Sequence, residues 1–457
     1  MARPSLDRRL GPIDAAAIIV SNVIGSGIFL TPAVVASLTG DPIAMVGVWL
    51  VGGFIAFAGA MSYAELAALR PHAGGEYVYL RAAFGPVAAF LTGWTSFVAG
   101  FSGAVAASAV GFAGYLGRFV PTAGDTRVLA ALPLGPMALT LTPQALVAIA
   151  LIAGLTWIHV RGVGPGRVVQ NILAGLKVSG LVALIVFGFS LGDGAWQHFQ
   201  PTEVSGTAGG FILALVPVMF SYSGWNAASY VAEEIRNPER FVPRSLAVGT
   251  GAVVALYLLL NVLYVYSLPI GELAATRGSV MDHIAERLFG PVAGDVMAVL
   301  AIVSIAASVS AMTIAGPRVY FAMARDRVFF RRAAVIHPVH GSPAAAIIAQ
   351  ALWSAVLVLT GSFSSLFTYT GFAVVLFSGI AGVALFVLRW RRPDETSPFR
   401  TWGYPVMPGL FVIASAAIVL NALLRDPVPT AAGLAIILGG LPLYVVFRRN
   451  SRKMGSG

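Results

Sequence analysis

Apolar segments of about twenty residues follow one another along nearly the whole chain, separated by short polar connections. A helix of that length crosses the roughly 30 Å hydrocarbon core of a bilayer. The pattern therefore predicts an all-α polytopic membrane protein with twelve transmembrane helices and no separate soluble domain. The predicted spans cover residues 13–38, 43–69, 86–116, 141–160, 170–190, 208–232, 246–268, 290–316, 344–361, 364–388, 405–424 and 429–447.

Two of these spans are interrupted by residues that disfavour a continuous helix. Gly25, Ser26 and Gly27 stand in the middle of the first span, and residues 221–226 interrupt the sixth. Each glycine costs about 1 kcal/mol relative to alanine inside a helix. Because five spans separate the interruptions, a second five-span unit would lie upside down relative to the first. We therefore predict a five-plus-five inverted repeat followed by two C-terminal helices.

This prediction divides the chain into two repeats, a pair of additional helices and a cytoplasmic tail. In that order, the four parts cover residues 1–190, 208–388, 405–447 and 448–457. The connection at 269–289 carries a weakly amphipathic helical pattern. The basic stretch at 318–343 is also predicted to be partly helical.

The basic residues are distributed as expected for a membrane protein. The formal net charge is +10, although only 11% of the residues are charged. If the N-terminus is inside and every span crosses, 23 of the 29 Lys and Arg residues fall inside and five outside, as the positive-inside rule requires. We therefore expect a multi-pass protein of the plasma (inner) membrane, surrounded by lipid, with both termini cytoplasmic. The basic character does not indicate a nucleic-acid partner.

The chain contains no cysteine. Disulfides, thiolate metal sites and a cysteine nucleophile are therefore excluded, and no disulfide-linked subunit is expected. No metal ion or other cofactor is predicted. The first apolar segment is too long and too interrupted for a cleavable signal peptide.

A pair of broken helices offers a binding site made of backbone groups. The half-helix that begins near Ser26 and Gly27 presents free N–H groups and a positive dipole end, which suit a carboxylate. The half-helices that end before Gly25 and near Ser221 present free carbonyls, which suit an ammonium group. One small zwitterion across both breaks would satisfy both sets. The alternative is that both breaks are glycine kinks in structural helices.

The side chains near the second break are aromatic. Phe220, Tyr222 and Trp225 either close over a ligand as gate or pocket residues, or belong to the core. No Asp or Glu stands in the middle of a predicted span. A ligand with a cationic side chain would require a buried carboxylate, because an unpaired buried charge is very costly. The pattern therefore favours a neutral ligand.

Lys177 lies about seven residues into the span 170–190, or roughly 10 Å from its inner boundary at 1.5 Å per residue. An ionisable group at that depth is a functional candidate by default. The alternative is that its long side chain reaches back to the inner interface.

Several short motifs resemble the amino acid–polyamine–organocation (APC) transporter superfamily. They are GSGIF at 25–29, YAEL at 63–66 and GGEY at 74–77. The runs at 222–226, 233–238, 243–244 and 318–326 are similar to its L-type amino acid transporter branch. The resemblance covers spans one to ten. It implies the inverted-repeat fold of the sodium-coupled leucine transporter, with alternating access.

The resemblance also implies roles for individual residues in substrate binding. The substrate carboxylate would bind at Ser26 and Gly27, and its amino group at the carbonyls of Val23, Phe220 and Ser223. Phe220 is similar to the aromatic gate of the family. Ser223 stands where many L-type members have glycine, which affects the size of the pocket.

A second set of residues is implied in coupling. Lys177 matches a lysine that occupies the place of a sodium ion in this branch. Tyr264 resembles the tyrosine that links this lysine to the first break, next to Gly25.

Together, the pattern and the resemblance predict a transporter of neutral L-amino acids that is sodium-independent and works as an exchanger. A proton-coupled amino acid symporter is the alternative within transport. An intramembrane enzyme would require a set of polar catalytic residues at one depth, and the six His residues do not form one. A channel or receptor would not require two breaks at inverted positions.

Overall fold

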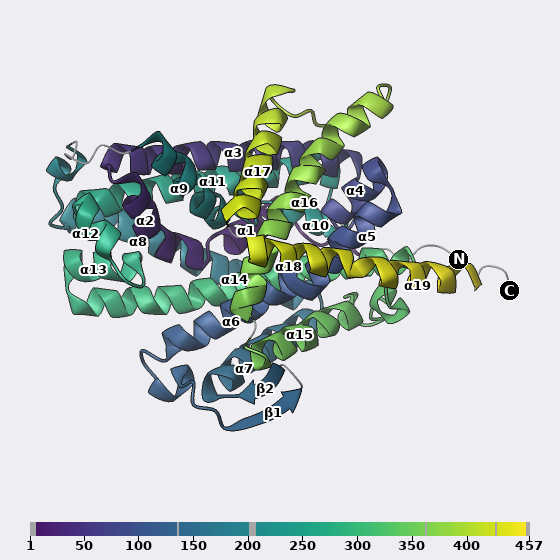
Figure 1. Ribbon diagram of the computed structural model, residues 1–457, viewed down its shortest axis with the longest axis horizontal. Coiled ribbons are helices and arrows are strands. Elements are labelled where there is room, and N and C mark those ends of the chain that lie inside the picture. Colours follow the sequence, from purple (N-terminus) through teal and green to yellow (C-terminus); the bar gives the residue numbers. More distant parts are fainter. Residues whose placement is uncertain (1–5, 135–136, 201–206, 362, 426, 454–457) are drawn as a thin grey trace.

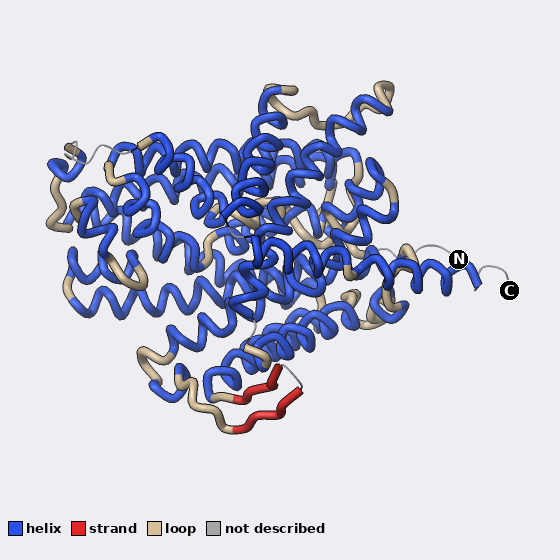
Figure 2. Tube along the Cα trace, viewed as in Figure 1, coloured by secondary structure: helices blue, strands red, loops and turns tan. Residues whose placement is uncertain are grey.

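The computed structural model describes residues 6–134, 137–200, 207–361, 363–425 and 427–453. Of the predicted tail at 448–457, residues 454–457 lie outside the described part of the chain. The described residues are mostly helical, with one pair of strands beside the helices (Figure 2).

The described residues up to Leu141 form eight helices and a hairpin. The helices are α1 (Pro12–Val23), α2 (Ser26–Thr39), α3 (Pro42–Leu69), α4 (Glu76–Phe84), α5 (Pro86–Thr95), the π-helix η1 (Ser96–Gly100), α6 (Phe101–Leu116) and the 3-10 helix η2 (Pro121–Gly124). The antiparallel strands β1 (Ala130–Leu134) and β2 (Met137–Leu141) pair with Ala130 opposite Leu141. This hairpin was not predicted from the sequence.

The remaining elements are again helical. They are α7 (Pro143–Val160), α8 (Val163–Leu191), η3 (Trp196–Phe199), α9 (Ala208–Ser221), α10 (Ala227–Tyr230), η4 (Ala232–Glu234), α11 (Pro238–Ser267), α12 (Ile270–Ala275), α13 (Val280–Phe289), α14 (Pro291–Arg325), η5 (Arg331–Ala334), α15 (Ala344–Leu359), α16 (Phe363–Arg391), α17 (Val406–Arg425), α18 (Pro427–Leu438) and α19 (Gly440–Lys453).

Nine helical segments in the described residues are long and apolar enough to cross a membrane. The pair α1 and α2 forms a tenth candidate, bent by 46° at its break. The helices α9 and α15 are apolar but shorter. The prediction of an all-α polytopic membrane protein is therefore confirmed, apart from the small hairpin. The count of twelve spans and the inverted repeat stay predictions.

The core of the bundle is built around α1, α3, α11 and α14. The helix α11 packs along α3 and α1, and α14 packs against α6, α8 and α1. Figure 1 shows α12 and α13 at one end of the bundle, α7, α15 and the hairpin along one side, and α17 on the opposite side. Because α1 is enclosed by α8, α11 and α14, the break after it lies inside the protein rather than against lipid.

Several helices are longer than the apolar pattern predicts. The helix α8 begins at Val163 rather than 170, α11 begins at Pro238 rather than 246, and α14 continues to Arg325 rather than 316. Hydrophobicity marks the part of a helix that crosses hydrocarbon, whereas backbone hydrogen bonding continues through charged turns outside it. The longer α8 places Lys177 at its midpoint.

The helices expected in the connections 269–289 and 318–343 are present. The amphipathic pattern at 269–289 corresponds to α12 and α13, and the basic stretch at 318–343 contains the end of α14 and the short η5.

Candidate functional site

The first break separates α1 from α2. Ile24 and Gly25 leave the helical conformation, with φ/ψ of −74°/94° and −132°/−150°. Gly25 supplies no side-chain cap to α2. Because the first N–H groups of any helix lack partners within it, the groups at Ser26 and Gly27 are available to a ligand.

The second break separates α9 from α10 and touches the first. At its centre, Gly224 has a φ of +104°, and a Cβ there would lie 2.6 Å from Asn22 Nδ2. Asn22 Nδ2 donates to the Gly224 carbonyl at 3.1 Å. Only glycine allows both the backbone conformation and this approach. The two breaks are therefore joined through Asn22 and Gly224.

A cavity of about 180 Å³ lies at the breaks and is lined from both of them. Further lining residues come from α4, α5, η1, α6, α14 and α16. All five residues predicted to bind substrate line this cavity, namely Val23, Ser26, Gly27, Phe220 and Ser223. The structure brings together residues that are nearly two hundred positions apart in the sequence.

Of the three aromatic residues at the second break, only Phe220 lines the cavity, and its side chain is 38% exposed. Tyr222 is buried and its hydroxyl donates to the Trp49 carbonyl at 3.1 Å. Trp225 packs edge-on against Tyr63, with ring centroids 4.8 Å apart. Tyr222 and Trp225 therefore pack into the core and do not line this cavity. The turn at residues 222–226 directs both side chains against α3.

Lys177 is fully buried and lies against the end of α1. Its Nζ donates to the Ser21 carbonyl at 3.0 Å, to the Ile24 carbonyl, and to Ser308 Oγ at 3.3 Å. Ser308 Oγ also donates to the Ser21 carbonyl at 2.8 Å. These donors satisfy carbonyls that α1 leaves free at the break. The alternative in which Lys177 reaches the inner interface does not agree with this geometry.

Tyr257 on α11 bridges the two breaks. Tyr257 Oη lies 3.0 Å from the Val23 carbonyl and 3.2 Å from the Ser221 carbonyl. Tyr264 is also buried, but its hydroxyl has no hydrogen-bond partner among the described residues. Seven residues separate the two tyrosines, so they share a face of α11 at different depths. The resemblance implied that Tyr264 links Lys177 to the first break, but its hydroxyl makes no hydrogen bond to either among the described residues.

We expect Tyr257→Phe to weaken the amino acid uptake that the sequence predicts, because it removes the single hydroxyl proton shared by the Val23 and Ser221 carbonyls, at a cost of about 1–3 kcal/mol. Tyr264→Phe is the matched control, since its hydroxyl forms no hydrogen bond, and it should leave uptake close to wild type. Initial uptake rates of both purified variants in liposomes test this expectation. Equal effects of the two substitutions would contradict the role given to Tyr257.

Glu76 lines the cavity and was missed in the sequence analysis. Its Oε1 accepts from Tyr63 Oη at 2.7 Å, Asn226 Nδ2 at 2.8 Å and Ser378 Oγ at 3.0 Å. Glu76 lies outside the middle of any predicted span, because it is the first residue of α4, between the second and third predicted spans. Its place in the GGEY motif was the available signal. The premise that no buried carboxylate is near the site is therefore corrected.

Ion pairs join α14 to the segment after the second break. Arg318 forms a buried bidentate pair with Glu234, both contacts being 2.9 Å, and Arg325 pairs with Glu233 at 2.9 Å. Burial raises the pKa of Glu233, but hydrogen bonds from Arg325 and the Ala73 N–H outweigh it and hold this pKa below the usual glutamate value. These pairs connect the C-terminal part of α14 to η4.

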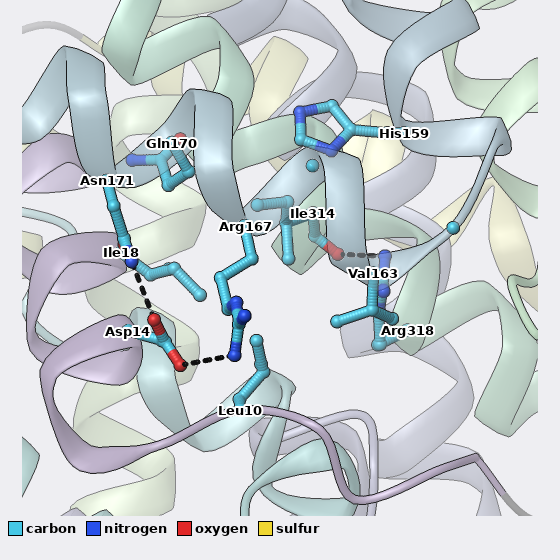
Figure 3. A pocket seen from close by; sticks show the side chains of 12 residues that line it. Leu10, Asp14, Ile18, His159, Val163, Arg167, Gln170, Asn171, Ile314 and Arg318 are labelled. Carbon is cyan, nitrogen blue, oxygen red and sulfur yellow. Dashed lines mark hydrogen bonds and ion pairs between the residues drawn. The ribbon is translucent and has the colours of Figure 1, made fainter.

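A second, much smaller cavity lies beside the start of α1 (Figure 3). Asn171 Nδ2 donates to Asp14 Oδ1 at 2.6 Å, and an Arg167 nitrogen lies 3.7 Å from Asp14 Oδ2. The amide of Gln170 is buried without a hydrogen-bond partner among the described residues. With a volume of about 10 Å³, this cavity has room for about one water molecule. It is too small to hold an amino acid.

A polytopic helical membrane protein with a cavity between two broken helices has the architecture of a secondary transporter. The chain belongs to the amino acid permease family, whose model matches residues 10–447, within the APC superfamily.

Relatives of known function extend over nearly the whole chain. The large neutral amino acids transporter small subunit 2 of Homo sapiens is 30% identical over 96% of this chain and 80% of its own. The Asc-type amino acid transporter 1 of Mus musculus is 28% identical over 99% of this chain and 83% of its own. The serine/threonine exchanger SteT of Bacillus subtilis is 28% identical over 96% of each chain.

Proposed function

We propose that this protein carries neutral L-amino acids across the plasma membrane by alternating access, independently of sodium, and that it works as an exchanger. The observation that carries the proposal is the cavity between the two breaks, where free N–H groups and carbonyls lie within reach of one small molecule. The names of the relatives support amino acids as substrates, and one of these relatives is named as an exchanger.

The substrate backbone would complete the hydrogen bonding of both breaks. Its carboxylate would accept from the N–H groups at Ser26 and Gly27, at the positive end of α2. Its ammonium group would donate to the carbonyls of Val23, Phe220 and Ser223. The Val23 and Phe220 carbonyls already accept from Tyr257 and from the Ser223 N–H, but a carbonyl has two lone pairs and can accept again.

Lys177 supports sodium independence. Its ammonium group donates to the Ser21 and Ile24 carbonyls, which are the kind of groups that hold a sodium ion in broken-helix transporters. If this ammonium group stays charged and in place through the transport cycle, no ion is carried across the membrane together with the substrate. The protein works as an exchanger if only its substrate-bound form converts between the outward-facing and inward-facing states. A lysine that released its proton in one state would instead give proton symport, which is the alternative.

The neutral character of the substrate rests on the relatives. The sequence argument against basic side chains required that no carboxylate be near the site, and Glu76 lines the cavity. One relative is named as a transporter of large neutral amino acids and another as a serine/threonine exchanger. We extend the class of neutral amino acids to the present chain.

We also propose twelve spans, with α1–α2 as the first and α9–α10 as the sixth. Both termini would then be cytoplasmic, and the inverted repeats would cover residues 1–190 and 208–388, with two further spans at 405–447. A protease added outside intact cells should not remove a C-terminal tag. Removal of the tag would mean that the span count is wrong by an odd number.

Uptake into liposomes tests the mode of transport. Purified protein should take up labelled serine or alanine only when the liposomes contain an unlabelled neutral amino acid, with or without sodium. Empty liposomes should show little uptake, even with an imposed pH gradient. Concentrative uptake into empty liposomes that follows the pH gradient would replace the exchanger with the symporter. No uptake under any condition would contradict transport of these substrates.

A further inference from the structure

Glu76 is the single formally charged side chain among the described residues that line the cavity. It is 5% exposed, and no Lys or Arg of the described residues forms an ion pair with it. Its Oε1 is instead held by the three neutral donors Tyr63, Asn226 and Ser378. Neutral donors stabilise an ionised carboxylate without cancelling its charge. Among the described residues that line the cavity, no cationic side chain offsets the charge that Glu76 carries when it is ionised.

The three donors come from different elements. Tyr63 lies on α3, Asn226 follows the second break, and Ser378 lies on α16. Each contact is between 2.7 and 3.0 Å. A side chain held from three directions has a fixed position. Because Asn226 lies two residues after Gly224, this position is tied to the break that we expect to bind the substrate backbone.

Two threonines on α5, Thr92 and Thr95, line the same cavity and add hydrogen-bond acceptors to it. Thr92 Oγ1 donates to the Ala88 carbonyl at 3.0 Å, and Thr95 Oγ1 donates to the Leu91 carbonyl at 2.8 Å. A hydroxyl has one proton and two lone pairs. Because each threonine uses its proton within its own helix, its oxygen is left to accept a hydrogen bond from a ligand.

We propose that Glu76, with Thr92 and Thr95, forms a side-chain selectivity site for amino acids whose short side chain donates a hydrogen bond. Hydroxyl and ammonium side chains fit this site, because the wall supplies acceptors and a negative charge. A carboxylate side chain does not fit, because it has no proton to donate and repels Glu76. This inference rests on the proposed function, since it requires the substrate backbone to bind at the two breaks, and it extends the proposed neutral class to amino acids with a short ammonium side chain.

A series of short amino acids tests the site. Binding of L-alanine, L-serine, L-2,4-diaminobutyrate and L-aspartate is measured on the purified full-length protein by thermal stabilisation, and the same four compete for exchange in liposomes. In wild type, serine and diaminobutyrate should bind more tightly than alanine. Aspartate should bind at least about tenfold more weakly than alanine, because even a modest repulsion between its side chain and Glu76 lowers affinity by that factor.

Glu76→Gln removes the charge but retains the size of the side chain and an oxygen for the same three donors. Relative to alanine, the penalty on aspartate should fall by about tenfold, and the advantage of diaminobutyrate should disappear. Glu272→Gln makes the same chemical change on the exposed face of α12 and should retain the wild-type order. An unchanged ratio of aspartate to alanine in Glu76→Gln would overturn the inference.

Binding and exchange separate this inference from the proposed function. Selective binding that responds to Glu76→Gln, without exchange in liposomes, would retain the selectivity site and contradict the transport mode. Exchange that shows no change in side-chain preference on Glu76→Gln would retain the proposed function and contradict the selectivity site.

Discussion

Lys177→Ala is expected to reduce exchange by about 100-fold or more. The substitution removes hydrogen bonds from a buried ammonium group to the Ser21 and Ile24 carbonyls. Hydrogen bonds to charged groups contribute about 1.5–3 kcal/mol each, and every 1.4 kcal/mol corresponds to about tenfold. Loss of this support should loosen the first break and weaken substrate binding, because Ser26 and Gly27 immediately follow the carbonyls that Lys177 holds.

The measurement is exchange in liposomes, together with substrate binding to the purified variant. Lys177→Met is a second variant, because it retains most of the side-chain volume and separates the loss of the cation from the loss of packing. Both variants should lose exchange and neither should acquire a dependence on a pH gradient. If wild type showed uptake driven by a pH gradient and Lys177→Ala did not, Lys177 would be a proton carrier and not a fixed cation.

Gly27→Val is expected to abolish uptake while the protein remains in the membrane. A Cβ at Gly27 would lie 2.9 Å from Ser221 Cα and 3.1 Å from Ser221 Cβ, where the end of α9 meets the start of α2. Overpacking of this kind costs about 1–3 kcal/mol. It would also separate the two half-helices whose backbone groups we expect to hold the substrate.

A smaller substitution supplies the matched comparison. Gly27→Ala should already reduce uptake by about tenfold, whereas Gly111→Ala should not, because a Cβ at Gly111 meets nothing within 4 Å. Expression, thermal stability and uptake are measured for each variant. Normal uptake by Gly27→Val would mean that neither the contact with Ser221 nor the proposed carboxylate position is required.

The class of the protein and the location of its two breaks follow from local patterns in the sequence. Apolar segments of membrane-spanning length, with glycines at 25 and 27 and a turn at 221–226, indicated broken helices before any contact was known. Backbone groups are present at every residue, and whether a segment can remain helical is largely a local property. For the same reason, the five residues predicted for substrate binding all line one cavity.

Which side chains face that cavity depends on the tertiary structure. Tyr222 and Trp225 stand next to the break but pack into the core. Tyr257, which the sequence did not single out, bridges the two breaks. Glu76 begins the short helix α4, between two predicted spans, and its side chain is held at the cavity by Tyr63 of α3 and Ser378 of α16. The direction of a side chain depends on packing between segments far apart in sequence, and no local pattern records that packing.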